Sequence, residues 1–408
     1  MNSPGFIGGR DHFEDFDLDS PEFRDNYDQV LDTLLEKCPV AHSKTFGGYW
    51  FVSRAEDVRH CAQDYETFTN TLGFEPNRSN EEGGLKLYPL EIDPPYHTRW
   101  RSALGPYFSP REIRSRADNI RQQANYLIDT FVERGSCEFV DEFAAQLPGR
   151  VFFGSFLGVP FDELSFIQKA TDTAMRGATS ERTGAWETVA EFLSQYLRSR
   201  ENEPARNDFV DAVLAGVETD DGKPCEWQDK LFIMLDMMAG GMGTTSHVIA
   251  SMVHHLATHS DDRQRVLADP KLRPNLVDEV IRVYAPIVAV GRTATRDTEV
   301  AGQKIKKGDF VMISQAAAAR DPRLIEEPKR VNIDRRTPVN LAFSYGPHRC
   351  IGAHVGRLEA SVALDEVLRR LPDFALPDGY QAVYSNCSVA RNMDELKLTF
   401  TPGDRDGR

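Results

Sequence analysis

The chain has 408 residues, of which 40% are hydrophobic, and its formal net charge is −15 at pH 7. This length is ample for a large buried core, and the acidic balance argues against nucleic-acid binding as the main role. Its six cysteines show no paired spacing, which argues against a disulfide framework or a zinc site and favours a reducing compartment. Residues 1–28 are rich in carboxylates, and we expect them to form a mobile or loosely packed start.

Helical periodicity dominates after residue 110, and it predicts helices over Arg111–Arg134, Val140–Leu157, Glu163–Met175, Thr183–Arg200, Phe209–Gly216, Gln228–Thr258, Asp261–Ala268, Pro274–Tyr284 and Ala353–Arg370. Strand patterns are found over Lys44–Val52, near Gly291–Thr295, in a hairpin over Thr298–Ser314 and over Gln381–Phe400. Because helices and strands do not alternate, the predicted class is mainly α with small β-sheets (α+β), not a Rossmann fold.

The sequence shows no segment that is expected to span a membrane and no linker that is expected to separate domains. No basic-then-apolar leader opens it, and the longest apolar stretch, Leu231 to Ala239, is too short to span a bilayer and contains Asp236. No linker or repeat interrupts the chain. We therefore expect one soluble, cytoplasmic domain over residues 1–408 that binds no membrane and no nucleic acid.

Three glycines interrupt the centre of the long helix predicted over Gln228–Thr258. They are Gly240, Gly241 and Gly243, and Thr244 follows them. Each costs a helix about 1 kcal/mol relative to alanine. One explanation is the close approach of a flat ligand together with a local opening of the backbone hydrogen-bond ladder. The alternative is tight helix–helix packing through small residues.

Cys350 lies in a glycine-containing turn just before the last predicted helix, in a stretch 343–352 that reads Phe-Ser-Tyr-Gly-Pro-His-Arg-Cys-Ile-Gly. A thiolate that faces a helix N-terminus is a stabilised anion, as an iron-binding cysteine requires. The alternative is a buried structural cysteine. The spacing resembles the haem-binding motif of the cytochrome P450 family, in which this thiolate is the axial ligand of the haem iron. The resemblance implies the P450 fold, with haem b between the long glycine-containing helix and the Cys-loop helix.

Further stretches resemble the family's haem contacts. The run Asp93–Arg101 resembles Asp-Pro-Pro-x-His-x-x-x-Arg, one arginine follows Arg282 by ten residues, and one histidine precedes Cys350 by two. Buried propionates need charged or polar partners. The resemblance therefore implies that the haem contacts are His97, Arg101, Gly240, Gly241, Arg292, Phe343 and His348.

Glu279 and Arg282 stand three residues apart on one predicted helix, which by itself is a common pattern for an exposed pair. The pair resembles the family's Glu-x-x-Arg helix, where a third arginine joins it to brace the Cys loop. The resemblance implies that this partner is Arg335, with Arg336 as the alternative. The role of the trio would be structural.

The glycine-rich centre of the long helix resembles the family's distal helix, in which an acid and an alcohol deliver protons during oxygen activation. Thr244 matches the alcohol, whereas Gly243 stands at the position of the acid. Thr245, Ser246 or His247 with ordered water are the candidate replacements. The expected substrate pocket is apolar and suits a terpenoid, aromatic or steroid-like molecule; its lining is predicted to include Thr244, Ile287, Val288, Val290, Val389 and the loop from Phe74 to Leu90.

The resemblance covers nearly the whole chain and implies a haem-thiolate monooxygenase, similar to the soluble bacterial camphor-hydroxylating enzymes, that inserts one atom of O2 into its substrate. No strand–Gly-x-Gly-x-x-Gly–helix unit is present, so we expect no bound flavin or NAD(P) and no fused reductase. Electrons are then expected from a [2Fe-2S] ferredoxin and its ferredoxin reductase, docked on Arg101, Arg349 and Arg357. Alternatives are a haem-thiolate peroxygenase or rearrangement catalyst, which Gly243 keeps open, and a non-catalytic haem-binding sensor.

Overall fold

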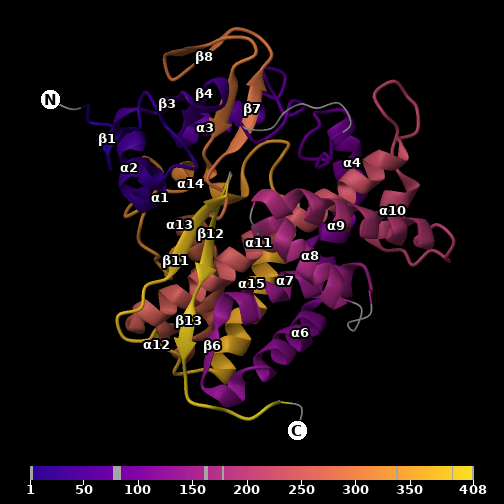
Figure 1. Ribbon diagram of the computed structural model, residues 1–408, viewed down its shortest axis with the longest axis vertical. Coiled ribbons are helices and arrows are strands. Elements are labelled where there is room, and N and C mark those ends of the chain that lie inside the picture. The colour runs from indigo at the N-terminus through magenta and orange to yellow at the C-terminus, as the bar shows by residue number, and fades with distance from the viewer. Residues whose placement is uncertain are drawn as a thin grey trace.

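The computed structural model describes residues 3–76, 84–159, 164–176, 179–336, 339–387 and 389–406. A strand-rich region, which contains the N-terminal end, and a larger helical region, which contains the C-terminal end, lie at opposite ends of the long axis (Figure 1). The long helix α11 (Trp227–Thr258) crosses the middle. This arrangement is the mainly α class with small sheets that the sequence predicts.

A five-stranded sheet organises the strand-rich region, with strand order β3-β4-β10-β7-β5. Its members are β3 (Val40–Ser43), β4 (Tyr49–Val52), β5 (Phe68–Thr69), β7 (Val290–Ala294) and β10 (Phe310–Ile313). Strand β10 pairs in parallel with β4 and antiparallel with β7, so the N-terminal segment and the chain after residue 290 share one sheet. The predicted hairpin is present as β8 (Thr298–Val300) and β9 (Gln303–Ile305), whereas β10 leaves it to join the sheet.

The acidic N-terminal segment packs against this sheet, contrary to the expected loose packing. It forms β1 (Phe6–Ile7), β2 (Arg10–Asp11), α1 (Pro21–Asp25) and α2 (Tyr27–Lys37). Phe16 and Phe23 are fully buried, and the ring centroid of Phe16 lies 4.2 Å from that of Phe51. The aromatic residues that alternate with the carboxylates therefore anchor the segment, since burial of large rings outweighs the cost of a high local charge.

The helical region follows the predicted order with differences in the boundaries. It contains α5 (Pro110–Arg114), α6 (Ala117–Asp129), α7 (Gln146–Arg150), α8 (Leu164–Arg176), α9 (Thr179–Arg200), α10 (Phe209–Ala215), α12 (Ser260–Ala268) and α13 (Arg273–Val283). The helix predicted over Arg111–Arg134 is divided, because the Ser115 hydroxyl donates to the Glu112 carbonyl at 2.6 Å and competes with the helical backbone. The helices that were not predicted are α1, α2, α3 (Ala55–Gln63), α4 (Tyr96–Leu104) and the short α14 (Gln315–Ala318).

The helix predicted over Val140–Leu157 contains two wider π-helical stretches, Val140–Ala144 and Val151–Phe156, on either side of α7. Pro148 lies inside α7 and has no N–H to donate to the preceding turn, which accounts for the irregular ladder. Glu163, the first residue of the next predicted helix, lies outside the described residues.

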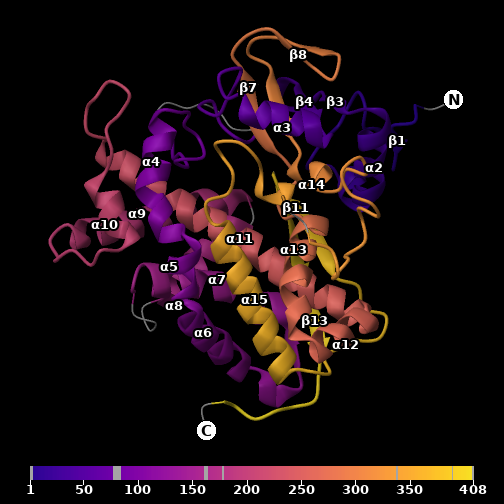
Figure 2. The same cartoon turned by 180° about the vertical axis from the view of Figure 1, so that it is seen from behind.

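Helix α11 is one continuous α-helix through its three glycines, so the expected local opening of its backbone ladder is wrong. It packs against α15 (Ala353–Arg370), which lies in front of it in Figure 2. The extended C-terminal chain is confirmed: β11 (Val383–Cys387) pairs with β12 (Ala390–Glu395), and β13 (Lys397–Thr399) pairs with β6 (Ser136–Glu138). Among the described residues, no helix has the length and apolarity needed to cross a membrane.

Candidate functional site

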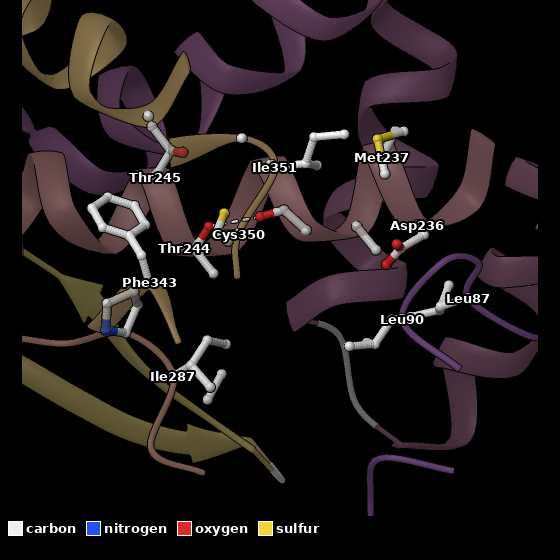
Figure 3. A pocket seen from close by; sticks show the side chains of 18 of the residues that line it. Leu87, Leu90, Asp236, Met237, Thr244, Thr245, Ile287, Phe343, Cys350 and Ile351 are labelled. Carbon is white, nitrogen blue, oxygen red and sulfur yellow. Dashed lines mark hydrogen bonds between the residues drawn. The ribbon is translucent and has the colours of Figure 1, made fainter. Parts of the chain in front are cut away.

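A cavity of about 400 Å³ with mostly apolar walls lies between α11, the loop that carries Cys350 and the segment that precedes β7 (Figure 3). It brings together residues from distant parts of the chain. The predicted site residues that line it are His97, Arg101, Gly240, Gly241, Gly243, Thr244, Thr245, Ile287, Val290, Arg292, Phe343, His348, Cys350 and Val389. Phe74, Leu87 and Leu90 from the predicted pocket loop line it too, whereas residues 77–83 of that loop lie outside the described residues.

Cys350 is held in a tight loop between the short 3₁₀ turn Leu341–Phe343 and the start of α15. Its backbone N–H donates to the carbonyl of Phe343 at 2.9 Å. At the bend, Gly346 has φ +69°, and a Cβ there would lie 2.5 Å from the carbonyl oxygen of Ala62 in α3. Glycine is therefore required at 346 both for the left-handed backbone and for the close approach to α3. The result is a free thiol whose sulfur opens into the cavity.

Burial raises the pKa of the Cys350 thiol, and this effect outweighs the hydrogen bond with the backbone of Gly352 and the positive charges of Arg101 and Arg357, which lower it. The helix end alone thus does not produce the stabilised anion that the sequence suggests. A bound metal ion deprotonates a coordinating thiol outright. The site consequently favours a neutral thiol on its own and a thiolate only with a metal.

Four basic side chains gather in the wall of the cavity. The rings of His97 and His348 lie 4.2 Å apart, and the buried guanidinium of Arg292 donates from Nη1 to the Gly291 carbonyl at 2.7 Å. Burial lowers the pKa of His97 to about 4 and that of Arg292 to about 10, and the neighbouring positive charges act on His97 in the same direction. Burial likewise lowers the pKa of His348 and of Arg101.

These basic groups have no carboxylate in ion-pair contact within the described chain. His97 Nδ1, His348 Nε2 and Arg292 Nη2 are buried without a hydrogen-bond partner there. The nearby carboxylate of Asp93 instead accepts from Asn70. Buried donors without acceptors are costly, so a ligand with two carboxylates would satisfy them and restore their pKa values. The cluster therefore fits the two propionates of the haem that the sequence resemblance implies.

Helix α11 presents a bare surface to the cavity at Gly240 and Gly241, where an added Cβ would meet nothing within 4 Å. The Thr244 hydroxyl lies beside them and donates to the Gly240 carbonyl at 2.7 Å. Thr245 is buried and contacts Gly356 of α15, where an added Cβ would lie 3.7 Å from its hydroxyl. The glycines thus leave room for a flat ligand, Thr244 lies beside it, and Thr245 belongs mainly to the helix–helix contact.

Glu279, Arg282 and Arg335 form one buried network, as the sequence suggests. Glu279 accepts two hydrogen bonds from Arg282, at 2.8 and 2.9 Å, and one from Arg335 at 2.9 Å, which favours Arg335 over Arg336 as the third partner. The network is tied to the Cys loop through the adjacent Asp278, whose carbonyl accepts from Asn340 at 2.9 Å. Asn340 in turn caps the 3₁₀ turn that precedes Cys350.

Val288, which was predicted individually as a pocket residue, does not line the cavity. It is fully buried in the core of the strand-rich region, and its backbone N–H donates to the Val389 carbonyl at 2.8 Å. Ile287 and Val290 face the cavity instead. The Ser314 hydroxyl donates to the Val288 carbonyl at 2.7 Å, so both backbone groups of Val288 are held against the core.

The polar residues of the cavity wall that were not predicted include Asp236, Gln315 and Glu359. Burial raises the pKa of Asp236 and of Glu359 to about 8. Asp236 left a signal in the sequence, since it interrupts the longest apolar stretch of the chain. Gln315 and Glu359 lie in short or amphipathic helical patterns where a polar residue is ordinary.

Comparison with known proteins agrees with this geometry. Residues 155–381 match the family described as Cytochrome P450. The chain is 30% identical over 404 residues to cytochrome P450 130 of Mycobacterium tuberculosis, covering 95% of this chain and 98% of the relative. It is 29% identical over 353 residues to the steroid C26-monooxygenase of Mycolicibacterium smegmatis, covering 85% and 86%.

A solved structure and a third relative agree with the family match. The crystal structure of CYP108D1 from Novosphingobium aromaticivorans superposes with a TM-score of 0.82 at 26% identity, covering 95% of this chain and 97% of that one. Vitamin D(3) 25-hydroxylase of Pseudonocardia autotrophica is 28% identical over 395 residues, covering 95% and 97%. A family match over more than half of the chain, a relative aligned along nearly its whole length and a shared fold lead to one conclusion: this chain belongs to the cytochrome P450 family and is a P450 monooxygenase.

Proposed function

We propose that this monooxygenase holds haem b, with the Cys350 thiolate as the protein ligand that would bind the iron. The observation that carries the proposal is the placement of a free thiol and four buried or half-buried basic groups around one cavity, opposite the bare glycines of α11. His97, Arg101, Arg292 and His348 would hold the propionates. When bound, a thiolate-ligated haem supplies the oxygen-activating chemistry, because the thiolate pushes electron density that favours O–O cleavage.

The protein's own residues then position the substrate and move protons. The apolar walls, formed by groups such as Phe156, Leu90 and Val248, favour an apolar molecule in the terpenoid, aromatic or steroid-like range. Two relatives whose names refer to a steroid and to vitamin D(3) support this range. Thr244 carries the hydroxyl that faces the cavity beside the glycines, and it would relay protons in place of the acid that Gly243 lacks.

Electrons would come from a separate [2Fe-2S] ferredoxin, reduced by its ferredoxin reductase. Of the three docking residues expected from the sequence, Arg101 is half-buried in the cavity wall and Arg357 pairs with Asp278 at 2.6 Å. Arg349 is exposed, and it acts electrostatically on the exposed His354 together with Arg114. The exposed arginines Arg114 and Arg349 on the Cys-loop side would form a basic patch that steers an acidic ferredoxin.

The test of the haem assignment is the red-shifted Soret band of the reduced carbon monoxide complex. Cys350→Ser should lose this band, whereas the matched control Cys38→Ser, at a half-buried cysteine of the strand-rich region, should keep it. A band that survives in Cys350→Ser would remove Cys350 from the ligand role.

A second measurement separates the monooxygenase from the peroxygenase alternative. Product should form with O2, ferredoxin and reductase, and its rate should greatly exceed the rate with hydrogen peroxide alone. The reverse ranking would assign the peroxide reaction to this site, and no product or electron consumption under either condition would favour a haem-binding sensor.

A further inference from the structure

One carboxylate stands in an otherwise apolar part of the cavity. Asp236 lies on α11 among Leu87, Leu90 and Met237, on the side of the cavity away from Phe343 (Figure 3). It is enclosed by protein, and the part of its surface that stays accessible opens into the cavity rather than to bulk solvent. Its position on the helix places it about 6 Å along the axis from Gly240, one turn away.

The described residues satisfy only part of this carboxylate. The backbone N–H of Leu90 donates to it, and no ion pair with it is found in the described ranges. A carboxylate offers about four acceptor sites. Among the described residues, the positive charge that acts on Asp236 is that of Arg101, which also belongs to the basic cluster described above. At least one oxygen therefore remains available to a molecule in the cavity.

The electrostatic surroundings favour a positive charge beside Asp236. Burial, and then the negative charge of Glu91, raise the pKa of Asp236 to about 8. Glu91 is itself buried and accepts from the Leu87 N–H at 2.7 Å, which fixes it in the same loop. A carboxyl group beside a second carboxylate is costly in an apolar wall, and a ligand cation next to Asp236 would reduce that cost.

Two other roles for Asp236, a tie to the neighbouring loop and a proton relay, explain its surroundings less well. Asp236 ties the loop around Leu90 to α11, but a neutral asparagine oxygen would do the same, so the tie does not require a charge. A direct proton transfer to Thr244 is too long, because eight residues separate the two along the helix, about 12 Å. Neither role uses the oxygen that faces the cavity.

We propose that Asp236 is a specificity-determining residue that binds a protonated amine at one end of an otherwise apolar substrate. The proposal rests on the proposed monooxygenase function and narrows its substrate class to an apolar body with a basic head. The amine would be held at the Leu87–Leu90 side of the cavity, and the apolar body would extend along Gly240 and Gly241 toward Thr244.

The test compares three probes that share one alkyl chain and differ in head-group charge: nonyltrimethylammonium, 1-nonanol and nonanoate. The quaternary nitrogen cannot ligate iron, so its binding reports the wall of the cavity. Dissociation constants are measured by equilibrium dialysis on the haem-loaded protein. We expect the wild type to bind nonyltrimethylammonium about tenfold or more tightly than 1-nonanol, and nonanoate most weakly.

The variants identify the source of this preference. Asp236→Asn keeps an oxygen for the Leu90 N–H and should bring the two dissociation constants within about threefold, with 1-nonanol binding unchanged. Asp236→Glu should retain the preference. Glu201→Gln removes the same charge from an exposed site and should leave all three constants unchanged.

Equal binding of the cation and the alcohol by the wild type would overturn the proposal, and so would a cation preference that survives in Asp236→Asn. The carbon monoxide spectrum is recorded on every sample. A missing red-shifted band in the wild type would contradict the haem-thiolate assignment, whereas a normal band without a cation preference would contradict only the role of Asp236.

Discussion

Arg282 and Glu279 face each other in a two-point ion pair that is fully buried, with Nε–Oε1 at 2.8 Å and Nη2–Oε2 at 2.9 Å. The remaining donors of Arg282 reach the carbonyls of Ala319, Pro328 and Arg330, so one guanidinium joins α13 to two separate loops. A planar fork with fixed donors is needed for this pattern. The pair thus supports the segment that leads to the Cys loop.

Arg282→Ala should lower the free energy of unfolding by about 3–5 kcal/mol, because it leaves the Glu279 carboxylate buried without its partner. We expect little folded, haem-loaded protein, measured by urea unfolding and by the haem-to-protein ratio. Arg282→Lys should be intermediate. Arg330→Ala, which breaks an exposed pair with Glu327, should cost less than about 1 kcal/mol. Normal unfolding of Arg282→Ala would show that the network does not brace the fold.

Arg292→Ala should weaken haem retention by about 1–3 kcal/mol or more, since a buried carboxylate would lose its partner. The measurement is the rate of haem transfer to an apo-globin acceptor. Arg296→Ala removes a largely exposed arginine from the chain just after β7 and should leave the rate unchanged. Equal rates for Arg292→Ala and the wild type would exclude Arg292 as a propionate partner.

Thr244→Ala should keep haem and substrate binding but divert electrons to hydrogen peroxide, because it removes the hydroxyl beside Gly240 and Gly241. The quantity to measure is product formed per electron consumed. If this ratio does not change, protons do not pass through Thr244. We expect Gly243→Asp to lower turnover as well, since residue 243 lies on nearly the same helix face as Asp236 and would add a second negative charge to the cavity.

Glu359→Gln should change how stability depends on pH. Burial raises the pKa of Glu359 from 4.5 to about 8, so the folded protein keeps a proton there that the unfolded chain releases. The wild type should therefore lose stability between pH 4.5 and about 8, by up to about 1.4 kcal/mol per pH unit from this group. The free energy of unfolding of Glu359→Gln, relative to that of the wild type, should rise over this range. A constant difference would contradict the buried, protonated carboxyl.

Val288→Ala and Val290→Ala should have different effects, although both residues were expected in the pocket. Val288 is fully buried in the core, and its truncation should cost about 2 kcal/mol of unfolding free energy with little effect on substrate binding. Val290 lines the cavity, so its truncation should change substrate affinity more than stability. The opposite pattern would place Val288 in the pocket.

Spacing along the chain was enough to predict the residues whose chemistry needs a particular side chain at a particular position. These residues form patterns between near neighbours in the sequence, which can be recognised without a structure. They are Cys350 with Gly346, the pair Glu279 and Arg282, and the glycines before Thr244. The class of fold followed from helical periodicity in the same way. Continuity of α11 did not, because the packing of α15 against it offsets the intrinsic cost of its glycines.

Contacts between side chains that are far apart in the sequence could not be predicted and depend on the folded arrangement. Contact with Glu279 favours Arg335 over Arg336, and packing in the core separates Val288 from Ile287 and Val290, which line the cavity. The buried Phe16 and Phe23 anchor an N-terminal segment whose charge alone suggested loose packing. Asp236 is a candidate for substrate specificity because the fold encloses it in an apolar wall. The free-energy cost of a buried carboxylate depends on its surroundings in space, which the neighbouring residues in the sequence do not reveal.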